Sequence, residues 1–304
     1  MTALHWACVP LLALLIDRLL GEPPAWLHPV VWMGRPLGWL TPRLARLRPA
    51  LAFTAGALVW LALALAVVVA AALLQTLART LTPWLAVLLL AVLVKPLLAW
   101  RVLRREVAAV EAALAESLTA GRMQVARLVS RDVSALSETE VREATLSTLA
   151  ENLNDSVVAP LFWLAVAGLP GMALYRFANT ADAMWGYRDD REWLGKWAAR
   201  ADDVLSWLPA RLTGLMLLAA GRTRPTAGWW RDARATPSPN GGWCMGALAR
   251  ALGVRLTKPG VYVLNPEGRA ATPADTPRAL AWAGRVAWVA AVLAAAGLAW
   301  GGAR

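Results

Sequence analysis

Two carboxylates stand just before an apolar run that begins at Val157. Glu151 and Asp155 are four positions apart, so on a continuing helix they share one face, with Asn152 beside them. Carboxylate and amide oxygens suit a hard cation such as Mg²⁺, which usually keeps water and substrate phosphate as further ligands. The spacing therefore indicates a metal site at Glu151 and Asp155, with a solvated helix end as the alternative interpretation.

A second polar set follows the apolar run. Arg176, Asn179, Thr180 and Asp182 fall at helical neighbour spacing. Arginine offers a fork of donors that suits phosphate or carboxylate, and the amide and hydroxyl could orient a nucleotide or an amine. A charge at bilayer depth costs roughly 2.5–3.5 kcal/mol, so this set predicts a binding site. The alternative is an anchor at the membrane edge, formed by Tyr175 and Arg176.

Arg211 lies inside another apolar segment, which also contains Pro209. A buried guanidinium needs an anionic partner, and either a phosphate or one of the acids Asp202 and Asp203 would serve. Adjacent acids point in different directions on a helix, so at most one of the two is expected to face a given ligand. Arg211 is therefore a candidate for phosphate binding, with a structural ion pair as the alternative.

A turn is predicted at 238–243, where Ser238 and Asn240 precede two glycines and Trp243. Its backbone N–H groups could receive an anion, although the sequence contains no Walker A pattern. A plain turn is the alternative. His28, which follows the first apolar segment, is a further candidate for substrate contact, or else an interfacial histidine.

The composition indicates that these residues belong to a membrane protein. Of the 304 residues, 58% are hydrophobic and 18 are tryptophan, and the mean hydropathy is +0.48. This is too apolar for an ordinary soluble domain. The net charge of +11 would suggest nucleic acid on a soluble protein. Here it fits arginines held in cytoplasmic loops, so no nucleic-acid partner is expected.

Long apolar segments predict four membrane-spanning helices, at 4–20, 49–78, 84–100 and 286–300. The third segment is expected to be interrupted at Lys95 and Pro96. Two weaker segments, 157–174 and 204–220, contain proline and are expected to be re-entrant or buried in the protein core.

Two insertions separate the apolar segments. Residues 101–156 predict a helical insertion, in which Val107, Val110, Leu114 and Leu118 form one apolar stripe. A capping box that begins at Ser137 predicts the start of a second helix there. Residues 222–285 are rich in proline and glycine and predict a loop-rich insertion.

Charge predicts the topology. If neither weak segment crosses the membrane, the chain has four spans, and everything from 101 to 285 lies on one side. All lysines and arginines except Arg79, Lys95 and Arg304 then face the cytoplasm, as the positive-inside rule requires. We therefore expect an all-α polytopic integral membrane protein with one domain, 1–304. It would lie in the bacterial inner membrane with its active face and both insertions in the cytoplasm.

Six motifs, taken in order, resemble the adenosylcobinamide-phosphate synthase family, a membrane protein family of cobalamin biosynthesis. They are D-R-L-L-G-E-P, H-P-V-x-x-M-G-R, E-N-x-x-D-x-V-V-A-P-L-F, Y-R-x-x-N-T-x-D-A-M-x-G-Y-R, D-D-V-x-S-W-x-P-A-R-L-T and D-A-R-x-x-P-S-P-N-x-G-W. They extend from Asp17 to Trp243, and several are long enough to be specific. The chain departs from the family pattern at Asn154, Ser156 and Cys244.

The resemblance implies ATP- and Mg²⁺-dependent amide formation. A carboxylate of the corrinoid adenosylcobyric acid would be joined to the amine of aminopropanol phosphate or a related amino alcohol phosphate. Phosphoryl transfer to give an acyl phosphate is the simplest way to activate a carboxylate. Membrane lipid and other cobalamin-assembly enzymes are the other partners expected. The rival interpretations are a transporter and a non-catalytic scaffold of corrinoid assembly.

The resemblance also suggests roles for the candidate residues. Glu151, Asp155 and Asp182 are the candidate catalytic residues. Glu151 and Asp155 would handle the metal or the amine, Arg176 and Arg211 would bind phosphate, and Asp182 would act with Asn179 in orienting the substrate. The remaining substrate contacts expected are Asn152, Thr180, Ser238, Asn240 and His28.

Overall fold

The computed structural model of the chain describes residues 3–187 and 189–301. Arg188, which ends the fourth motif, and Arg304 lie outside the described residues. Two compact units can be distinguished from the contacts within the chain. Unit 1 consists of Met1–Ala99, Ala159–Ser206 and Ala290–Arg304, and unit 2 consists of Trp100–Val158 and Trp207–Val289.

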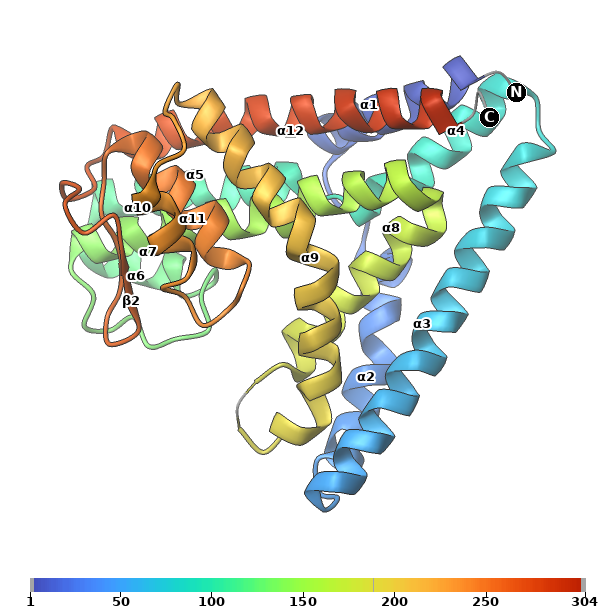
Figure 1. Ribbon diagram of the computed structural model, residues 1–304, viewed down its shortest axis with the longest axis horizontal. Helices are drawn as coiled ribbons and strands as arrows, with labels where there is room; N and C mark the ends of the chain where they lie inside the picture. The colour runs from blue at the N-terminus through green and yellow to red at the C-terminus, as the bar shows by residue number, and fades with distance from the viewer. Residues whose placement is uncertain (1–2, 188, 302–304) are drawn as a thin grey trace. The chain divides into compact units, whose positions relative to one another are not determined.

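Unit 1 is built from long apolar helices with two short 3₁₀ turns. It contains α1 (Ala3–Leu20), η1 (Ala25–Leu27), α2 (Pro29–Leu44), α3 (Pro49–Arg79), α4 (Pro83–Val94), η2 (Lys95–Leu97), α8 (Ala159–Trp185), the start of α9 (Glu192–Ala220) and the end of α12 (Asp275–Gly301). α8 packs against both α2 and α3, and α1 packs against α4 (Figure 1). The predicted interruption at Lys95 and Pro96 is confirmed, because α4 ends at Val94 and the 3₁₀ turn η2 follows.

The core of unit 1 is aromatic at its centre. Trp60 of α3 lies 5.6 Å from Phe177 of α8, measured between ring centroids. Trp185, fully buried at the end of α8, donates a hydrogen bond of 2.8 Å from its indole nitrogen to the hydroxyl of Thr41 in α2. Gly56 allows α3 to approach α9 closely, since a Cβ there would lie 2.4 Å from the carbonyl oxygen of Leu194.

The helix α8 is broken within its apolar half. Ala167 and Gly168 leave helical geometry, and Gly168 has φ of +66°, a conformation that glycine adopts without steric cost. The break releases the N–H of Leu169, which donates to Oε1 of Gln75 in α3 at 2.7 Å. Pro170 has no N–H to satisfy. A polar side chain from a neighbouring helix thus compensates an irregular backbone in apolar surroundings.

Unit 2 contains the predicted insertions. Its elements are α5 (Trp100–Glu116), α6 (Leu118–Val125), α7 (Glu138–Leu153), η3 (Asn154–Val158), the end of α9, α10 (Ala227–Ala233), α11 (Gly241–Leu252), β1 (Leu256–Lys258), β2 (Tyr262–Leu264) and the start of α12. The capping box at Ser137 is confirmed at the start of α7. The stripe is buried at Val107, Val110 and Leu114, whereas Leu118 begins the next helix.

The strands β1 and β2 were not predicted. They form an antiparallel hairpin in which Leu256 pairs with Leu264. Gly260, with φ of +70°, lies in the connection between them. The hairpin is held to α7 because the N–H of Thr257 donates to Oε2 of Glu143 at 2.9 Å. Strands of this length carry too little periodicity to be distinguished from loop in the sequence.

Five helical stretches within residues 3–187 and 189–301 are long and apolar enough to cross a membrane. They are Pro49–Arg79, Pro83–Glu116, Glu138–Trp185, Glu192–Ala220 and Asp275–Gly301. Three include the predicted segments 49–78, 84–100 and 286–300, and two include the weaker segments. The first predicted segment, 4–20, forms α1, which is not among the five. A multi-pass membrane protein is therefore confirmed, while the re-entrant course of 157–174 and 204–220 stays a prediction.

Candidate active site

The two candidate acids of unit 2, Glu151 and Asp155, lie where α7 changes from α-helical to π-helical winding. Glu151 is in the last turn of α7, and Asp155 is in the π-helical turn η3. The helix therefore continues past Glu151 as expected, but with π-helical instead of α-helical winding over residues 154–158. π-Helical turns are rare and occur frequently at functional sites.

Asn154 accounts for much of this local geometry. Its side-chain amide donates to Oδ1 of Asp155 at 2.8 Å, and its carbonyl oxygen accepts a bond of 3.1 Å from the hydroxyl of Thr213 in α9. Asn154 is 2% exposed, so the contact that orients the Asp155 carboxylate is itself protected from water. The sequence contains no local signal for this long-range arrangement.

The charges of both acids influence a buried thiol of α11. Burial raises the pKa of the Cys244 thiol well above its usual range, and the negative charges of Asp155 and Glu151 raise it further. Burial also raises the pKa of Tyr262 in β2, again with a contribution from Glu151. A Cβ at Gly241 would lie 3.1 Å from Oε1 of Glu151, so this acid is beside the first residue of α11. The N-terminus of a helix favours such a negative charge.

Arg211 and Asn240, which were predicted as separate candidates, are in contact. The guanidinium lies over the rings of Trp207 and Trp243, with its central carbon 4.0 Å and 4.6 Å from their centroids. Its Nη1 donates to Oδ1 of Asn240 at 3.2 Å and to the carbonyl oxygen of Trp207. Stacking on two indoles and two hydrogen bonds restrict the orientation of this cation. The two tryptophans were not predicted as part of the site, although Trp207 is one helical turn before Arg211.

The predicted turn at 238–243 is present only as far as Asn240, because residues 241–243 form the start of α11. The hydroxyl of Ser238 accepts hydrogen bonds from the N–H groups of Asn240 and Gly241, at 3.1 and 3.3 Å. The hydroxyl of Thr236 accepts from the N–H of Gly242 at 3.1 Å. These three N–H groups are therefore bonded within the chain. The two hydroxyls therefore fix the start of α11 and, with it, the positions of Asn240 and Trp243.

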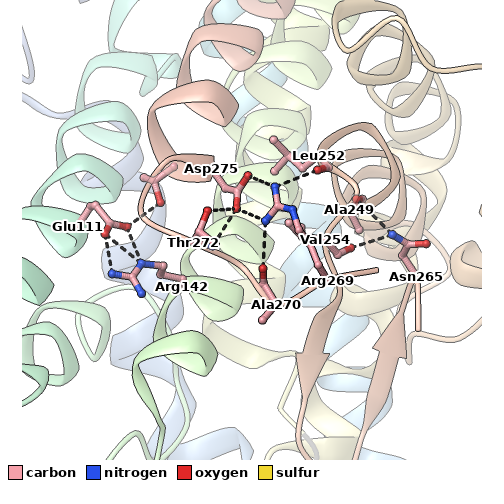
Figure 2. A network of polar contacts seen from close by, with 11 residues as sticks. Glu111, Arg142, Ala249, Leu252, Val254, Asn265, Arg269, Ala270, Thr272 and Asp275 are labelled. Atoms are coloured by element: carbon pink, nitrogen blue, oxygen red, sulfur yellow. Dashed lines mark hydrogen bonds and ion pairs between the residues drawn. The ribbon is translucent and has the colours of Figure 1, made fainter. Parts of the chain in front are cut away.

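Two ionic networks hold the helices that carry this part of unit 2 (Figure 2). Arg142 of α7 donates through Nε and Nη2 to Glu111 of α5, at 3.0 and 2.9 Å, and Thr276 of α12 donates to the same acid at 2.9 Å. In the second network, two guanidinium nitrogens of Arg269 each lie 2.7 Å from an oxygen of Asp275. The first network fixes α7, and with it Glu151, against two other helices.

Asp232, the first residue of the sixth motif, has a structural role. It is 4% exposed and accepts a hydrogen bond of 2.6 Å from Nε of Arg250 in α11. Its other oxygen accepts from the N–H of Asn265 at 3.2 Å. Asp232 thus joins α10 to α11 and to the loop after β2.

The polar set of unit 1 forms a chain of contacts. Arg176 donates from Nη1 to Oδ1 of Asn179 at 3.3 Å, and the amide of Asn179 donates to Oδ1 of Asp202 in α9 at 3.4 Å. The hydroxyl of Thr180 donates to the carbonyl oxygen of Arg176 at 2.7 Å. Asp182 is partly buried and lies on the same helix, three residues after Asn179.

His28 belongs to a separate cluster in unit 1. Its Nδ1 accepts from the N–H of Val30 at 3.3 Å, so Nε2 is the donor to Oε2 of Glu22, 3.0 Å away. The ammonium of Lys95 donates to the same oxygen at 3.1 Å. Burial alone would raise the pKa of Glu22, but the contacts with His28 and Lys95 outweigh it and lower that pKa.

The predicted residues therefore fall into two sets, each described within its own unit. The set in unit 2 includes Glu151, Asn152, Asp155, Arg211, Ser238 and Asn240, and the set in unit 1 includes His28, Arg176, Asn179, Thr180 and Asp182. The side chain of Asn152 bonds within its own helix, where its amide donates to the carbonyl oxygen of Thr148 at 3.1 Å.

The donor set of unit 2 fits Mg²⁺ better than a transition metal. In the described part of the chain, no three side chains of histidine, cysteine, aspartate or glutamate form a potential metal cluster. Glu151 and Asp155 offer carboxylate oxygens only. Mg²⁺ is commonly held by one or two carboxylates, with water and substrate phosphate completing its shell.

Comparison with known proteins identifies the family. The family model described as CobD/Cbib protein matches residues 10–283. A probable cobalamin biosynthesis protein CobD of Thermococcus kodakarensis is 42% identical over 292 residues, covering 94% of this chain and 95% of the relative. The cobalamin biosynthesis protein CobD of Rhodobacter capsulatus is 40% identical over 302 residues, covering 91% and 93%.

A relative from a third organism is similar over most of its length. A probable cobalamin biosynthesis protein CobD of Methanothermobacter thermautotrophicus is 39% identical over 265 residues, covering 84% of this chain and 86% of the relative. No solved structure matches the chain. The family model and the full-length relatives agree, and the chain belongs to the CobD/CbiB family of cobalamin biosynthesis proteins.

Proposed function

We propose that the protein catalyses ATP- and Mg²⁺-dependent amide formation between a carboxylate of adenosylcobyric acid and the amine of aminopropanol phosphate or a related amino alcohol phosphate. One observation carries the proposal. In unit 2, Glu151 lies beside Gly241 at the start of α11, and Arg211 contacts the same end of that helix through Asn240 and Trp243. Oxygen ligands and an oriented guanidinium are the groups that phosphoryl transfer needs.

The chemistry has two steps. A carboxylate oxygen of the corrinoid attacks the γ-phosphorus of ATP, giving an acyl phosphate and ADP. The amine then attacks the acyl carbon and inorganic phosphate leaves, with loss of the amine proton. Arg211 would bind phosphate oxygens in both steps. Its fixed position lowers the reorganisation needed as charge develops.

The acidic residues have complementary proposed roles. Glu151 and Asp155 would hold Mg²⁺, which when bound shields the phosphate charge of ATP. The hydrogen bond from Asn154 fixes the Asp155 carboxylate in one orientation. Asn152, Ser238 and Asn240 would contribute further contacts to substrate, with Ser238 acting through the turn that it stabilises.

We assign substrate binding to the polar set of unit 1. Arg176 would bind the phosphate of the amino alcohol, while Asn179, Thr180 and the catalytic candidate Asp182 would orient the amine. The contact with Asp202 supports this assignment. Because Asp202 accepts a hydrogen bond from the Asn179 amide nitrogen, the Asn179 side chain is held in one orientation, with its oxygen toward Arg176. His28 would contact the corrinoid.

The proposed location is the bacterial inner membrane, with the active face in the cytoplasm, where ATP is available. Other cobalamin-assembly enzymes are proposed partners, because a corrinoid must be passed between successive steps. The positively charged loops support this orientation.

The test uses the full-length protein purified in detergent with adenosylcobyric acid, aminopropanol phosphate and Mg-ATP. The amide product is followed by mass spectrometry and ADP by an enzymatic assay. We expect Arg211→Lys to lose most activity, because lysine keeps the charge without the planar fork. Arg224→Lys, at an exposed arginine of the same unit, is the matched control and should behave as the native protein. Absence of both ADP and amide from the native protein would refute the proposal.

A further inference from the structure

Unit 1 contains a cavity to which the proposed reaction assigns no substrate, although His28, proposed to contact the corrinoid, bonds to Glu22 in its lining. Its volume is about 760 Å³, and its walls come from α1, α2, α3, α4 and α8. This volume lies within the range of about 300–1,000 Å³ typical of pockets for small ligands. The walls are apolar over most of their area, with Leu63, Val67 and Leu74 from α3 and Phe177 from α8. Among the described residues that line it, only Glu22 and Lys95 carry charge.

The position of the cavity along α3 indicates its surroundings. The lining residues of this helix lie between Leu63 and Leu74, near the middle of Pro49–Arg79. This stretch is long and apolar enough to span a membrane, and most of its window is not buried by protein. The wall therefore lies at the depth of the hydrocarbon, where acyl chains are the available solvent. An apolar cavity takes up apolar groups in preference to water.

The charged end of the cavity is held by ion pairs and is mostly buried. The Lys95 side chain is 7% exposed, and its ammonium lies 3.1 Å from Oε2 of Glu22 and 4.0 Å from Oδ1 of Asp17. His28 donates to Glu22 from the other side at 3.0 Å. One carboxylate and one ammonium thus line the cavity, while the second carboxylate near Lys95, that of Asp17, is fully buried outside the lining.

We propose that this cavity binds a bilayer phospholipid with a zwitterionic headgroup of the phosphoethanolamine class. An acyl chain lies against α3 and α8, the headgroup ammonium meets Glu22, and the phosphate meets Lys95. A headgroup that carries both charges matches the two charged residues of the lining, which have opposite signs. A headgroup with phosphate alone would add a negative charge beside Glu22 and Asp17 without a counterpart. This binding goes beyond the amide-forming reaction and does not depend on it.

The first test compares retained lipid in three variants. The protein is purified in detergent and its lipid is extracted and measured by mass spectrometry. Ala66 and Ala70 of α3 line the cavity, and Ala62 is an exposed alanine of the same helix outside the lining. Ala70→Trp is expected to lose phosphatidylethanolamine, while Ala62→Trp retains it. If Ala70→Trp does not fold, Ala66→Leu fills less space and replaces it. Equal retention by the filling and control variants would overturn the proposal.

The second test distinguishes binding of the intact lipid from binding of its headgroup alone. Delipidated protein is mixed with phosphatidylethanolamine, phosphatidylglycerol or free phosphoethanolamine, and thermal unfolding is followed. Phosphatidylethanolamine alone is expected to raise Tm substantially. Glu22→Gln is expected to weaken its binding about tenfold, the size of effect produced by losing one charge-assisted hydrogen bond. An equal shift from phosphatidylglycerol would overturn the headgroup assignment, and an equal shift from free phosphoethanolamine would overturn the lipid.

Discussion

The side-chain oxygen of Gln75 accepts a hydrogen bond of 2.7 Å from the backbone N–H of Leu169, where α8 is broken. The two residues belong to different helices of unit 1 and meet in apolar surroundings. A donor left without an acceptor there would carry its full desolvation cost. The contact therefore makes the irregular backbone of α8 tolerable.

Gln75→Leu is predicted to destabilise the protein by about 1–3 kcal/mol, because the released N–H loses its acceptor. Thermal unfolding in detergent measures this as a lower Tm. Thr76→Val, at the exposed neighbouring position on α3, is the control and should leave Tm nearly unchanged. Equal Tm values for the native protein and Gln75→Leu would contradict the assigned role.

Thr213→Val is predicted to lower activity by about 10-fold to 100-fold, as is common when a residue that orients a ligand group is lost. The change removes the hydroxyl that donates to Asn154, and Asn154 in turn orients Asp155. The kcat for amide formation is the measurement. Thr54→Val is the matched control, since Thr54, like Thr213, donates to the helix carbonyl four residues earlier. A normal kcat for Thr213→Val would show that the hydrogen bond from Thr213 to Asn154 is not needed for amide formation.

Cys244 is predicted to resist alkylation in the native protein. Burial, with the charges of Asp155 and Glu151, raises its pKa, so the thiolate that reacts is scarce. Since the folded pKa is above the unfolded value, this group stabilises the fold fully below pH of about 8.5 and progressively less above it. Intact-mass measurement of iodoacetamide labelling in a Cys8→Ala background tests this. Rapid labelling at pH 8 before unfolding would show that the thiol is accessible and ionised.

Arg142→Met is predicted to cost about 1.5–3 kcal/mol, because it leaves Glu111 without its charged partner. Hydrogen exchange should increase along α7, and Tm should fall. The comparison is Arg127→Met, which breaks an ion pair with Glu106 in which the arginine is 63% exposed. Exposed pairs contribute at most about 1 kcal/mol, so this second variant should change little. Similar losses in both would mean that Arg142 does not brace the helix.

The topology has its own prediction. A cysteine at Trp193, an exposed position near the start of α9, is expected to react with membrane-impermeant reagents only from the cytoplasmic side. Sealed vesicles of known orientation and a Cys8→Ala, Cys244→Ala background provide the assay. A cysteine at Arg224 serves as a reference within the predicted cytoplasmic insertion. Labelling of the Trp193 position from the outside would rule out the four-span arrangement.

Features set by neighbouring residues were predictable from the sequence. The capping box at Ser137 needs only residues three apart, and the interruption after Val94 needs only Pro96. The apolar stripe of α5 follows from the helical period. Because these causes are local, they are visible in the chain before it folds.

Features set by distant residues were not predictable. The π-helical turn η3 involves Asn154, whose acceptor oxygen is bonded by Thr213, 59 residues away. Arg211 was identified as a cation in need of a partner, but its position over Trp243 depends on how α9 packs against α11. The sequence predicted these residue types and their chemistry, whereas their mutual geometry required the fold.

The contact between Gln75 and Leu169 also has a consequence for biogenesis. Gln75 precedes Leu169 by 94 residues, so α3 leaves the ribosome well before α8 is synthesised. The acceptor is therefore in the membrane by the time the broken helix arrives with its exposed donor. The order in which α3 and α8 are synthesised thus sets the order in which they assemble. The broken segment of α8 would insert poorly alone, and α3, synthesised earlier, supplies the acceptor for its free N–H group.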